Sequence, residues 1–520
     1  MTAGDRRAAP GPPAQRDAVI VGGGHNGLVA AILLARAGRS VLVLERGAEL
    51  GGAAVSRRVF PGVDARVSCY SYLVSLFPAE LRRKLGLQVE LRTRSVSSYT
   101  PDGDDGLLIC DSREITAASL QRLTGDRHAR ARWEAFSARL SRLARRVSGT
   151  LTRPLPTRGE LRGLVDDDAI WSALIEEPLG RLLERWFESD LLRGVVLTDA
   201  TIGTFAPAED PLLRQNRCFL YHVIGDGTGL WKVPVGGMGA LTGALIEAAA
   251  RAGVEVRTGA EVVGVETDGT SAEVSCADGS RHRARHVLAN VAPAVLTRLL
   301  GQPTTTEPGP EGSQLKLNLL LSRLPRLRDS AVTVEQAFAG TFHVNEGYQQ
   351  MQQAYAQAAA GSIPGLPPCE LYCHSLTDPT ILSPELRAAG AHTLTAFALH
   401  MPARLFGAPG AKAAAVAATI DSINSVLGEP IEDCLWIAPD GEPCLDARTP
   451  LELEAELGMP GGHIFHRDLA WPFAESEDEV GSWGVETAQA NVWLCGAGAR
   501  RGGGVSGIPG HNAARALLTR

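Results

Sequence analysis

The chain has 520 residues, of which 44% are hydrophobic and 21% are charged, and its formal net charge is −7. This length exceeds a single typical hydrophobic core, so we expect two domains. The negative charge argues against a general nucleic-acid-binding protein. No apolar run approaches the roughly 18 residues that cross a bilayer, and residues 1–16 lack the apolar centre of a secretory signal. We therefore expect a cytoplasmic globular protein whose residues 1–16 form a disordered tail.

A glycine-rich turn follows this tail and is the most informative segment of the chain. An apolar strand over residues 18–21 leads into Gly22-x-Gly24-x-x-Gly27, then into a helix of small residues and a second apolar strand that ends at Glu45. Gly22 allows the tight turn, Gly24 lets a pyrophosphate approach the backbone, and Gly27 lets helix and strand pack closely. The helix N-terminus offers unpaired N–H groups to phosphates. Together these elements predict a dinucleotide-binding unit in which Glu45 accepts hydrogen bonds from ribose hydroxyls.

The residues beyond Glu45 favour FAD over NAD as the dinucleotide. Arg46 is followed by a glycine pair, Gly51 and Gly52, and then by Ala53. Because glycine has no side chain, this pair allows a second close approach of the backbone to a diphosphate.

Two later segments also combine a glycine-rich turn with a following helix. Residues 234–239 (PVGGMG) open an alanine-rich helix that runs to about residue 252, and a strand is expected over residues 260–266. Near the C-terminus a strand that ends at Gly496 leads into a glycine-rich loop, and a helix is expected to begin near Pro509. The N-terminus of that helix is expected to face the pyrimidine edge of a flavin and to stabilise the anion of the reduced ring.

From residue 17 onward the chain resembles the phytoene desaturase family of flavoproteins, and within it the branch of pyridine nucleotide-disulfide oxidoreductase domain-containing protein 2. The motifs that carry the resemblance are GGGHNGL at 22–28, SCYSYLVSLFP at 68–78, GDGTGLWKVPVGGMGAL at 225–241, GGHIFHRDL at 461–469 and CGAGARRGGGVSGIPG at 495–510. The resemblance implies an α/β fold, in which a discontinuous Rossmann-like FAD-binding domain carries an inserted α+β substrate domain, as in amine oxidases. The FAD-binding domain would comprise residues 17–75, 233–305 and 485–520, and the substrate domain residues 76–232 and 306–484.

The resemblance also implies which residues bind FAD. Glu45 would hold the adenosine ribose, and the backbone of Val262 would contact the adenine. Many flavoproteins of this superfamily carry Gly-Asp at the C-terminal strand, whereas this chain has Gly496-Ala497, so backbone N–H groups must do more of the work. The full expected set is Gly22, Gly24, His25, Asn26, Gly27, Glu45, Arg46, Gly51, Gly52, Ala53, Val262, Gly496, Gly503, Gly504 and Val505.

The flavin would carry the redox chemistry, so the protein needs to place a substrate C–H bond over flavin N5 and to exclude water. His222, His463 and His466 are candidate bases because they lie in motif-like segments, although a lone histidine is more often structural. Trp231 is a candidate wall of the pocket, with core packing as the alternative, and we expect Lys232 to be solvated.

Missing motifs exclude other chemistry. The sequence has no GxSxG, HExxH or Walker A pattern, which removes hydrolase, zinc-protease and nucleotidase interpretations. A second GxGxxG and a redox cysteine pair are also missing, so a disulfide reductase is not expected. We interpret Cys369 and Cys373 as ordinary thiols, and we predict no metal site.

An arginine-rich segment over residues 121–163 predicts a basic amphipathic helix. Its apolar residues Trp133, Phe136, Leu140, Leu143 and Val147 repeat at helical spacing. Residues 130–148 could dock on an anionic membrane. The alternative, which we favour, is a surface helix whose apolar stripe packs on the substrate domain.

Elsewhere we expect strands over 315–321 and 393–399, a helix over 411–427, and a crossing between the domains at Gly301–Ser313. For function, we expect an FAD-dependent oxidoreductase that moves hydride between flavin N5 and a C–C bond of a largely apolar small molecule. Desaturation, saturation and double-bond isomerisation all fit, with oxygen or a quinone as electron acceptor. The alternatives are a flavin amine oxidase and a non-catalytic lipid-group-binding protein on the same fold, as in Rab escort proteins. The intact glycines and Glu45 favour the enzyme.

Overall fold

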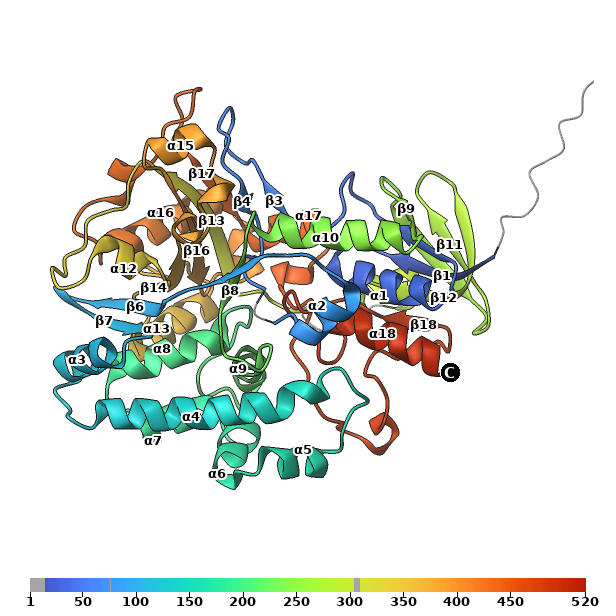
Figure 1. The fold of residues 1–520 in the computed structure, drawn as a ribbon, viewed down its shortest axis with the longest axis horizontal. Coiled ribbons are helices and arrows are strands. Elements are labelled where there is room, and N and C mark those ends of the chain that lie inside the picture. Colours follow the sequence, from blue (N-terminus) through green and yellow to red (C-terminus); the bar gives the residue numbers. More distant parts are fainter. Residues whose placement is uncertain (1–14, 75, 304–308) are drawn as a thin grey trace, which may run out of the picture.

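The computed structural model describes residues 15–74, 76–303 and 309–520. Figure 1 shows two sheets side by side, one with helices packed against it and the other bordered by a layer of helices. Of the predicted tail, residues 1–14 lie outside the described residues, as do residues 304–308 of the predicted crossing. Arg16 does not belong to a tail, because it opens the first strand and its guanidinium pairs with Glu255.

The first sheet draws its strands from three distant parts of the chain. Its order is β10-β11-β12-β1-β2-β9, and β18 pairs with β12 beyond the end of β11. β1 runs parallel to β2 and β12, whereas β10, β11 and β12 form an antiparallel meander. The strands are β1 (Arg16–Val21), β2 (Val41–Leu44), β9 (Glu255–Arg257), β10 (Val262–Thr267), β11 (Ala272–Cys276), β12 (Arg281–Ala289) and β18 (Val492–Leu494).

Alternation along β1 separates the two faces of this sheet. Ala18 and Ile20 pack in one core with α1 (His25–Arg36), α10 (Met238–Arg251) and α18 (Ile508–Thr519). Val19 and Val21 pack in another core with the meander and α11 (Pro293–Leu299). Because both faces are covered, the central strands are apolar throughout, as is usual for parallel strands.

The second sheet has the order β17-β13-β16-β15-β14-β6-β7. Its neighbours are antiparallel apart from the parallel pair of β6 and β14. The strands are β6 (Val96–Asp102), β7 (Asp105–Cys110), β13 (Gln314–Leu321), β14 (Thr341–Val344), β15 (Cys369–Tyr372), β16 (His392–Leu399) and β17 (Leu445–Arg448). The predicted strands over 315–321 and 393–399 are therefore confirmed as β13 and β16.

Helices surround this second sheet. Those between the strands include α12 (Val334–Phe338), α13 (Tyr348–Ala359), α14 (His374–Thr377), α15 (Pro384–Ala388), α16 (Ala411–Asn424) and α17 (Pro450–Leu457). The helical layer consists of α3 (Arg113–Thr124), α4 (Ala129–Val147), α5 (Arg158–Val165), α6 (Asp168–Trp171), α7 (Leu179–Trp186), α8 (Asp190–Thr201) and α9 (Arg214–Ile224). The short elements β3 (Ser56–Arg57), β4 (Val67–Ser68), α2 (Ala79–Leu85), β5 (Leu91–Thr93) and β8 (Lys232–Pro234) connect the two halves.

The arginine-rich segment forms α3, α4 and α5 rather than one helix, and α4 carries the predicted apolar stripe. Phe136, Leu143 and Val147 are buried in the core of the helical layer, and Trp133 and Leu140 pack against it. Packing within the helical layer accounts for this stripe. None of the described helices is both long enough and apolar enough to cross a membrane.

Candidate dinucleotide site and cavity

One cavity of about 360 Å³ joins the two halves of the molecule. Glycines and polar residues around the first sheet line one part of it, and Tyr72, Trp231, Phe397 and Phe465 line another. Of the residues expected to bind a dinucleotide, the cavity brings together Gly22, Gly24, His25, Asn26, Glu45, Arg46, Gly52, Ala53, Val262, Gly504 and Val505.

The three glycines of the turn after β1 have different roles. Backbone geometry and packing require glycine at positions 22 and 27, whereas Gly24 is bare where it lines the cavity. Gly22 has a φ of +97°, and a Cβ on Gly27 would lie 2.4 Å from the carbonyl oxygen of Gly22. Gly24 caps α1 with a φ of −70°, a value open to any residue, and it lines the cavity. The Asn290 amide closes the turn by donating to the Gly22 oxygen at 3.0 Å. Gly27 therefore allows α1 to pack closely against the turn, while Gly24 presents its backbone to the cavity without a side chain.

Glu45 follows β2 and is held by two backbone groups. Its Oε2 accepts from the N–H of Gly23 at 2.7 Å, and its Oε1 accepts from the N–H of Gly47 at 2.7 Å. Each carboxylate oxygen keeps a second lone pair, so the group can still accept hydrogen bonds from ribose hydroxyls. The neighbouring Arg46 is exposed, and its guanidinium donates to the Glu456 carbonyl oxygen at 2.8 Å.

The two glycines of the pair at positions 51 and 52 also have different roles. Gly51 has a φ of +124°, and its N–H donates to the Gly23 carbonyl at 3.0 Å. A Cβ on Gly51 would lie 2.8 Å from the Val55 and Thr242 side chains, so this glycine serves packing. Gly52 lines the cavity together with Ala53.

The C-terminal loop contributes Gly504 and Val505 to the cavity, but not Gly496 or Gly503. A Cβ on Gly503 would lie 2.8 Å from the Leu469 side chain, and one on Gly496 would lie 3.2 Å from Asn290. Both positions are therefore constrained by packing, since a side chain there would meet these neighbours. α18 begins at Ile508 with Pro509 in its first turn, as predicted.

Orphaned polar atoms at the start of α1 test whether a dinucleotide fits this cradle. The Nε2 of His25 and the Oδ1 of Asn26 are buried without a hydrogen-bond partner, and both residues line the cavity. Burial lowers the pKa of His25 to about 4, so its ring is neutral at pH 7. Buried polar atoms without partners are costly, and a polar ligand at the helix N-terminus would satisfy them. The cradle fits a dinucleotide.

The three candidate histidines occupy different surroundings. His222 lines the cavity, and its Nδ1 lies 3.0 Å from the Cys218 carbonyl oxygen. That contact requires a proton on Nδ1, which leaves Nε2 as the basic nitrogen of the neutral ring. His466 also lines the cavity, and burial lowers its pKa to about 4. His463 is fully buried outside the cavity lining, and its Nδ1 accepts from the Phe465 N–H at 3.2 Å.

Trp231 and Lys232 are adjacent residues of the 225–241 motif. Trp231 lines the cavity, with the guanidinium of Arg94 at 5.9 Å from its ring centre. The expectation of a solvated Lys232 is wrong, because its side chain is 15% exposed and its Nζ lies 2.9 Å from an Asp226 carboxylate oxygen. This pair fixes the loop that carries Trp231.

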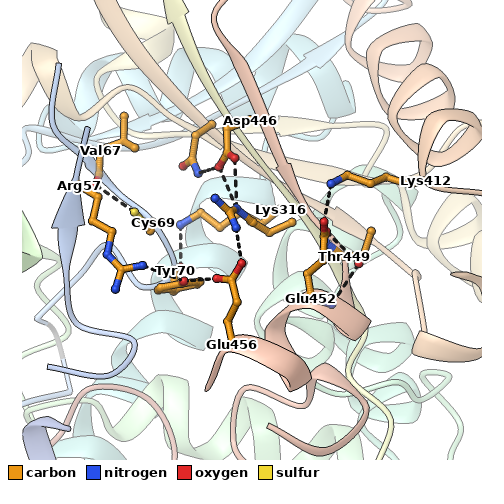
Figure 2. A network of polar contacts seen from close by, with 12 residues as sticks. Arg57, Val67, Cys69, Tyr70, Lys316, Lys412, Asp446, Thr449, Glu452 and Glu456 are labelled. Carbon is orange, nitrogen blue, oxygen red and sulfur yellow. Dashed lines mark hydrogen bonds and ion pairs between the residues drawn. The ribbon is translucent and has the colours of Figure 1, made fainter. Parts of the chain in front are cut away.

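Sequence reasoning missed a buried lysine on the cavity wall. Lys316 lies on β13, and its Nζ donates to the carbonyl oxygens of Ser68 and Tyr70 at 2.7 Å each. Figure 2 shows it within a polar network in which the Tyr70 hydroxyl donates to Glu456. Burial lowers the pKa of Lys316 to about 7. A single cation in the leucine-rich strand QLKLNLLL was the signal that could have found it.

The cavity is also lined by carboxyl groups that the sequence did not single out, among them Asp199 on α8 and Glu370 on β15. The cysteines are all free thiols. Cys369 and Cys373 are buried, and burial raises the pKa of Cys373 to about 11. The structure thus agrees with the interpretation of both residues as ordinary thiols.

The fold is shared with solved structures of amine oxidases. The model of the NAD(P)-binding Rossmann-like domain matches residues 20–78. Putrescine oxidase bound to putrescine has a TM-score of 0.58 at 17% identity over 98% of this chain and 100% of its own. Cyclohexylamine oxidase from Brevibacterium oxydans has a TM-score of 0.57 at 16% identity, again over 98% and 100%.

Relatives in sequence define the family. Pyridine nucleotide-disulfide oxidoreductase domain-containing protein 2 of Rattus norvegicus is 30% identical over 96% of this chain and 93% of its own length. The chain belongs to the family of that protein. The uncharacterized protein Rv0897c of Mycobacterium tuberculosis is 51% identical over 96% of this chain and 97% of its own. Hydroxyneurosporene desaturase of Cereibacter sphaeroides is 30% identical over 54% of this chain and 56% of its own.

Proposed function

We propose that the protein binds FAD and transfers hydride between flavin N5 and a C–C bond of a largely apolar small molecule, as a desaturase, a saturase or a double-bond isomerase. The observation that carries this proposal is the continuity of the cavity. The glycine cradle and Glu45 share one volume with Tyr72, Trp231 and Phe397. A dinucleotide in the cradle would therefore meet an apolar substrate without an intervening wall.

In this proposal the chain's own residues bind, orient and exclude water. The bare backbone at Gly24 and the N-terminus of α1 would hold the pyrophosphate, Glu45 the ribose, and the backbone of Val262 the adenine. FAD supplies hydride acceptance or donation when it is bound. The aromatic side chains would shield the substrate carbon from water, and the neutral rings of His25 and His466 add no charge near it.

The carbon–carbon chemistry rests on the partial relationship to hydroxyneurosporene desaturase. An amine substrate is the second candidate, because two carboxyl groups, those of Asp199 and Glu370, line the cavity and could attract a cation. A binding protein without turnover is disfavoured, because Gly22, Gly24, Gly52 and Glu45 are all kept and line the cavity.

Two further parts of the proposal concern partners. Oxygen or a quinone would reoxidise the flavin. Residues 130–148 would offer only their arginine face to an anionic membrane, since the apolar stripe of α4 is taken up by packing.

Anaerobic mixing tests the proposed reaction. We expect the visible absorbance of the bound flavin to bleach with an apolar unsaturated or saturated hydrocarbon-like substrate, such as a carotenoid or a terpene. Primary alkylamines serve as the matched alternative. Bleaching by amines alone would replace the carbon–carbon assignment with an amine oxidase. If neither class bleaches the oxidised flavin, and no unsaturated candidate restores the colour of the chemically reduced flavin, hydride transfer with these substrates is refuted.

A further inference from the structure

A buried cluster of carboxyl groups and one imidazole adjoins the cavity. His343 on β14 and Glu370 on β15 face each other as cross-strand partners. Glu346 lies three residues beyond His343, and its Oε2 is hydrogen-bonded to the Nδ1 of that ring. Asp199, near the end of α8, completes the group. Ligand-type atoms of His343, Glu346 and Glu370 lie within 4.8 Å of one another.

The local sequence explains how these groups meet. Asn345 adopts a φ of +52°, which turns the chain directly after β14 and precedes Glu346. Gly194 lets α8 approach this turn, because a Cβ there would lie 1.8 Å from the Glu346 carbonyl oxygen. The same helix reaches β15 through Thr198, whose hydroxyl donates to Glu370 Oε1 at 3.2 Å. The Tyr372 hydroxyl donates to the other oxygen of Glu370 at 2.5 Å.

The cluster has an excess of acid. Among the residues that the structure describes, no lysine or arginine forms an ion pair with Asp199, Glu346 or Glu370. The Oε1 of Glu346 is buried without a partner, and the carboxyl group of Asp199 makes no hydrogen bond or ion pair with any described residue. Three carboxylates beside one imidazole would leave a costly excess of negative charge in this buried environment. At least one of the three carboxyl groups must therefore be protonated.

Asp199 and Glu370 line the same cavity as Trp231 and Phe397. We propose that Asp199 is the acceptor of the proton that the substrate loses, and that Glu370, Glu346 and His343, which share a proton among themselves, set the charge beside it. The inference rests on the proposed function and adds its missing base. It assigns a catalytic role to Asp199 and positioning roles to the other three.

The proposed step balances as a desaturation. One substrate C–H bond breaks with both electrons, and the hydride passes to the FAD of the proposed function, which is reduced. The C–H bond on the neighbouring carbon gives its proton to a carboxylate oxygen of Asp199. The electron pair of that second bond forms the new C=C bond, so the substrate is oxidised by two electrons.

The acidities of the cluster suit this role. Burial raises the pKa of Glu370 to about 8, and it raises that of Asp199 as well. Burial alone would lower the pKa of His343, but the Glu346 carboxylate holds it above its ordinary value. Groups that titrate near neutral pH can both accept and release a proton during turnover. The titratable groups that face the cluster from neighbouring elements are Tyr72, Cys218, His222, Cys369 and Tyr372.

The test compares Asp199→Asn, Asp199→Glu and Glu370→Gln with the wild-type holoenzyme, and Glu385→Gln, an exposed carboxylate on α15, is the control. We expect Asp199→Asn to slow substrate-dependent flavin bleaching by about 10²–10⁴-fold, and Asp199→Glu to restore part of the rate. FAD content and photoreduction of the flavin by an external donor should stay unchanged. Infrared spectra between about pH 5 and about pH 10 should show a deuterium-sensitive protonated carboxyl band that titrates in the wild type and is reduced in Glu370→Gln.

The infrared measurement needs no substrate and keeps the inference separate from the proposed function. If the substrate bleaches the flavin of the wild type and of Asp199→Asn at the same rate, the inference is overturned while the proposed function stands. A wild type without a titrating carboxyl band, or one whose cluster holds a stoichiometric divalent metal by elemental analysis, would overturn it too. A wild type that has no flavin, or that no substrate class bleaches, would instead refute the proposed function while the infrared band still reports on the shared proton.

Discussion

At the scale of the residue, glycines of one motif have separate tasks, and a pair of variants separates them. Gly24→Ala places a methyl group at the cavity without backbone strain, 3.0 Å from the Asn290 amide nitrogen. We expect it to weaken FAD retention at least tenfold with little change in melting temperature. Gly27→Ala places its methyl 2.4 Å from the Gly22 carbonyl oxygen, so it should lower the melting temperature and the yield of folded protein.

Fluorescence titration of FAD and thermal unfolding, made on both variants, check this pair. Equal losses of FAD affinity and of stability in the two variants would show that the glycines act as one unit, contrary to the geometry.

The Glu370 carboxyl group gives a second residue-scale prediction, on the pH dependence of stability. Because burial raises its pKa to about 8, the folded protein holds a proton that the unfolded chain releases above its ordinary pKa of 4.5. Its contribution to wild-type stability is therefore complete at low pH and is lost as the pH rises toward 8. The amide introduced by Glu370→Gln cannot ionise, so the stability of this variant relative to wild type should increase from about pH 5 to about pH 9.

Denaturant unfolding of both proteins at several pH values measures this difference. A constant difference over that range would mean that Glu370 has an ordinary pKa in the folded protein.

At the scale of the element, the N-terminal unit was predictable and the acid cluster was not. β1, α1 and β2 follow from an apolar run, a glycine turn and a second apolar run, all within some thirty residues. β14 (TFHV) and β15 (CELY) are only four residues long, and although polar and apolar side chains alternate along them, both of their faces are buried, so the polar face cannot be recognised as a site from the pattern alone. The meeting of His343 with Glu370 depends on the pairing of these strands, which single-sequence patterns do not specify.

The α4 helix carries an element-scale prediction. Phe136 is buried and its ring contacts those of Trp186 and Phe187, so Phe136→Ala should cost about 3–5 kcal/mol of stability. The exposed arginines Arg142 and Arg145 serve as the matched control, and their replacement by Gln should leave the melting temperature nearly unchanged.

Thermal unfolding and flotation with anionic vesicles, made on both sets of variants, distinguish the two interpretations of the helix. A stable Phe136→Ala protein that no longer floats with vesicles would show that the stripe meets lipid rather than the core.

At the scale of the whole molecule, three distant segments build one sheet, and the second sheet lies beside it (Figure 1). A cavity joins the two halves. The resemblance of the motifs predicted that distant segments would build one domain, and eleven of the residues expected to bind a dinucleotide line the cavity. Gly27, Gly51, Gly496 and Gly503 do not line it, and a Cβ at each of these positions would meet neighbouring atoms. Lys316 and Asp199 escaped prediction since neither lies in a recognisable motif, and their position at the cavity depends on how β13 and α8 pack in the assembled fold.

The most direct test of the account is the visible spectrum of the purified wild-type protein, followed by acid release and identification of any flavin. The account predicts a yellow protein that releases intact, non-covalently bound FAD, with about one FAD per chain because the structure offers one glycine cradle of this kind in its described part. A colourless protein that also fails to take up added FAD would contradict it, and the cradle would then have to bind some other ligand.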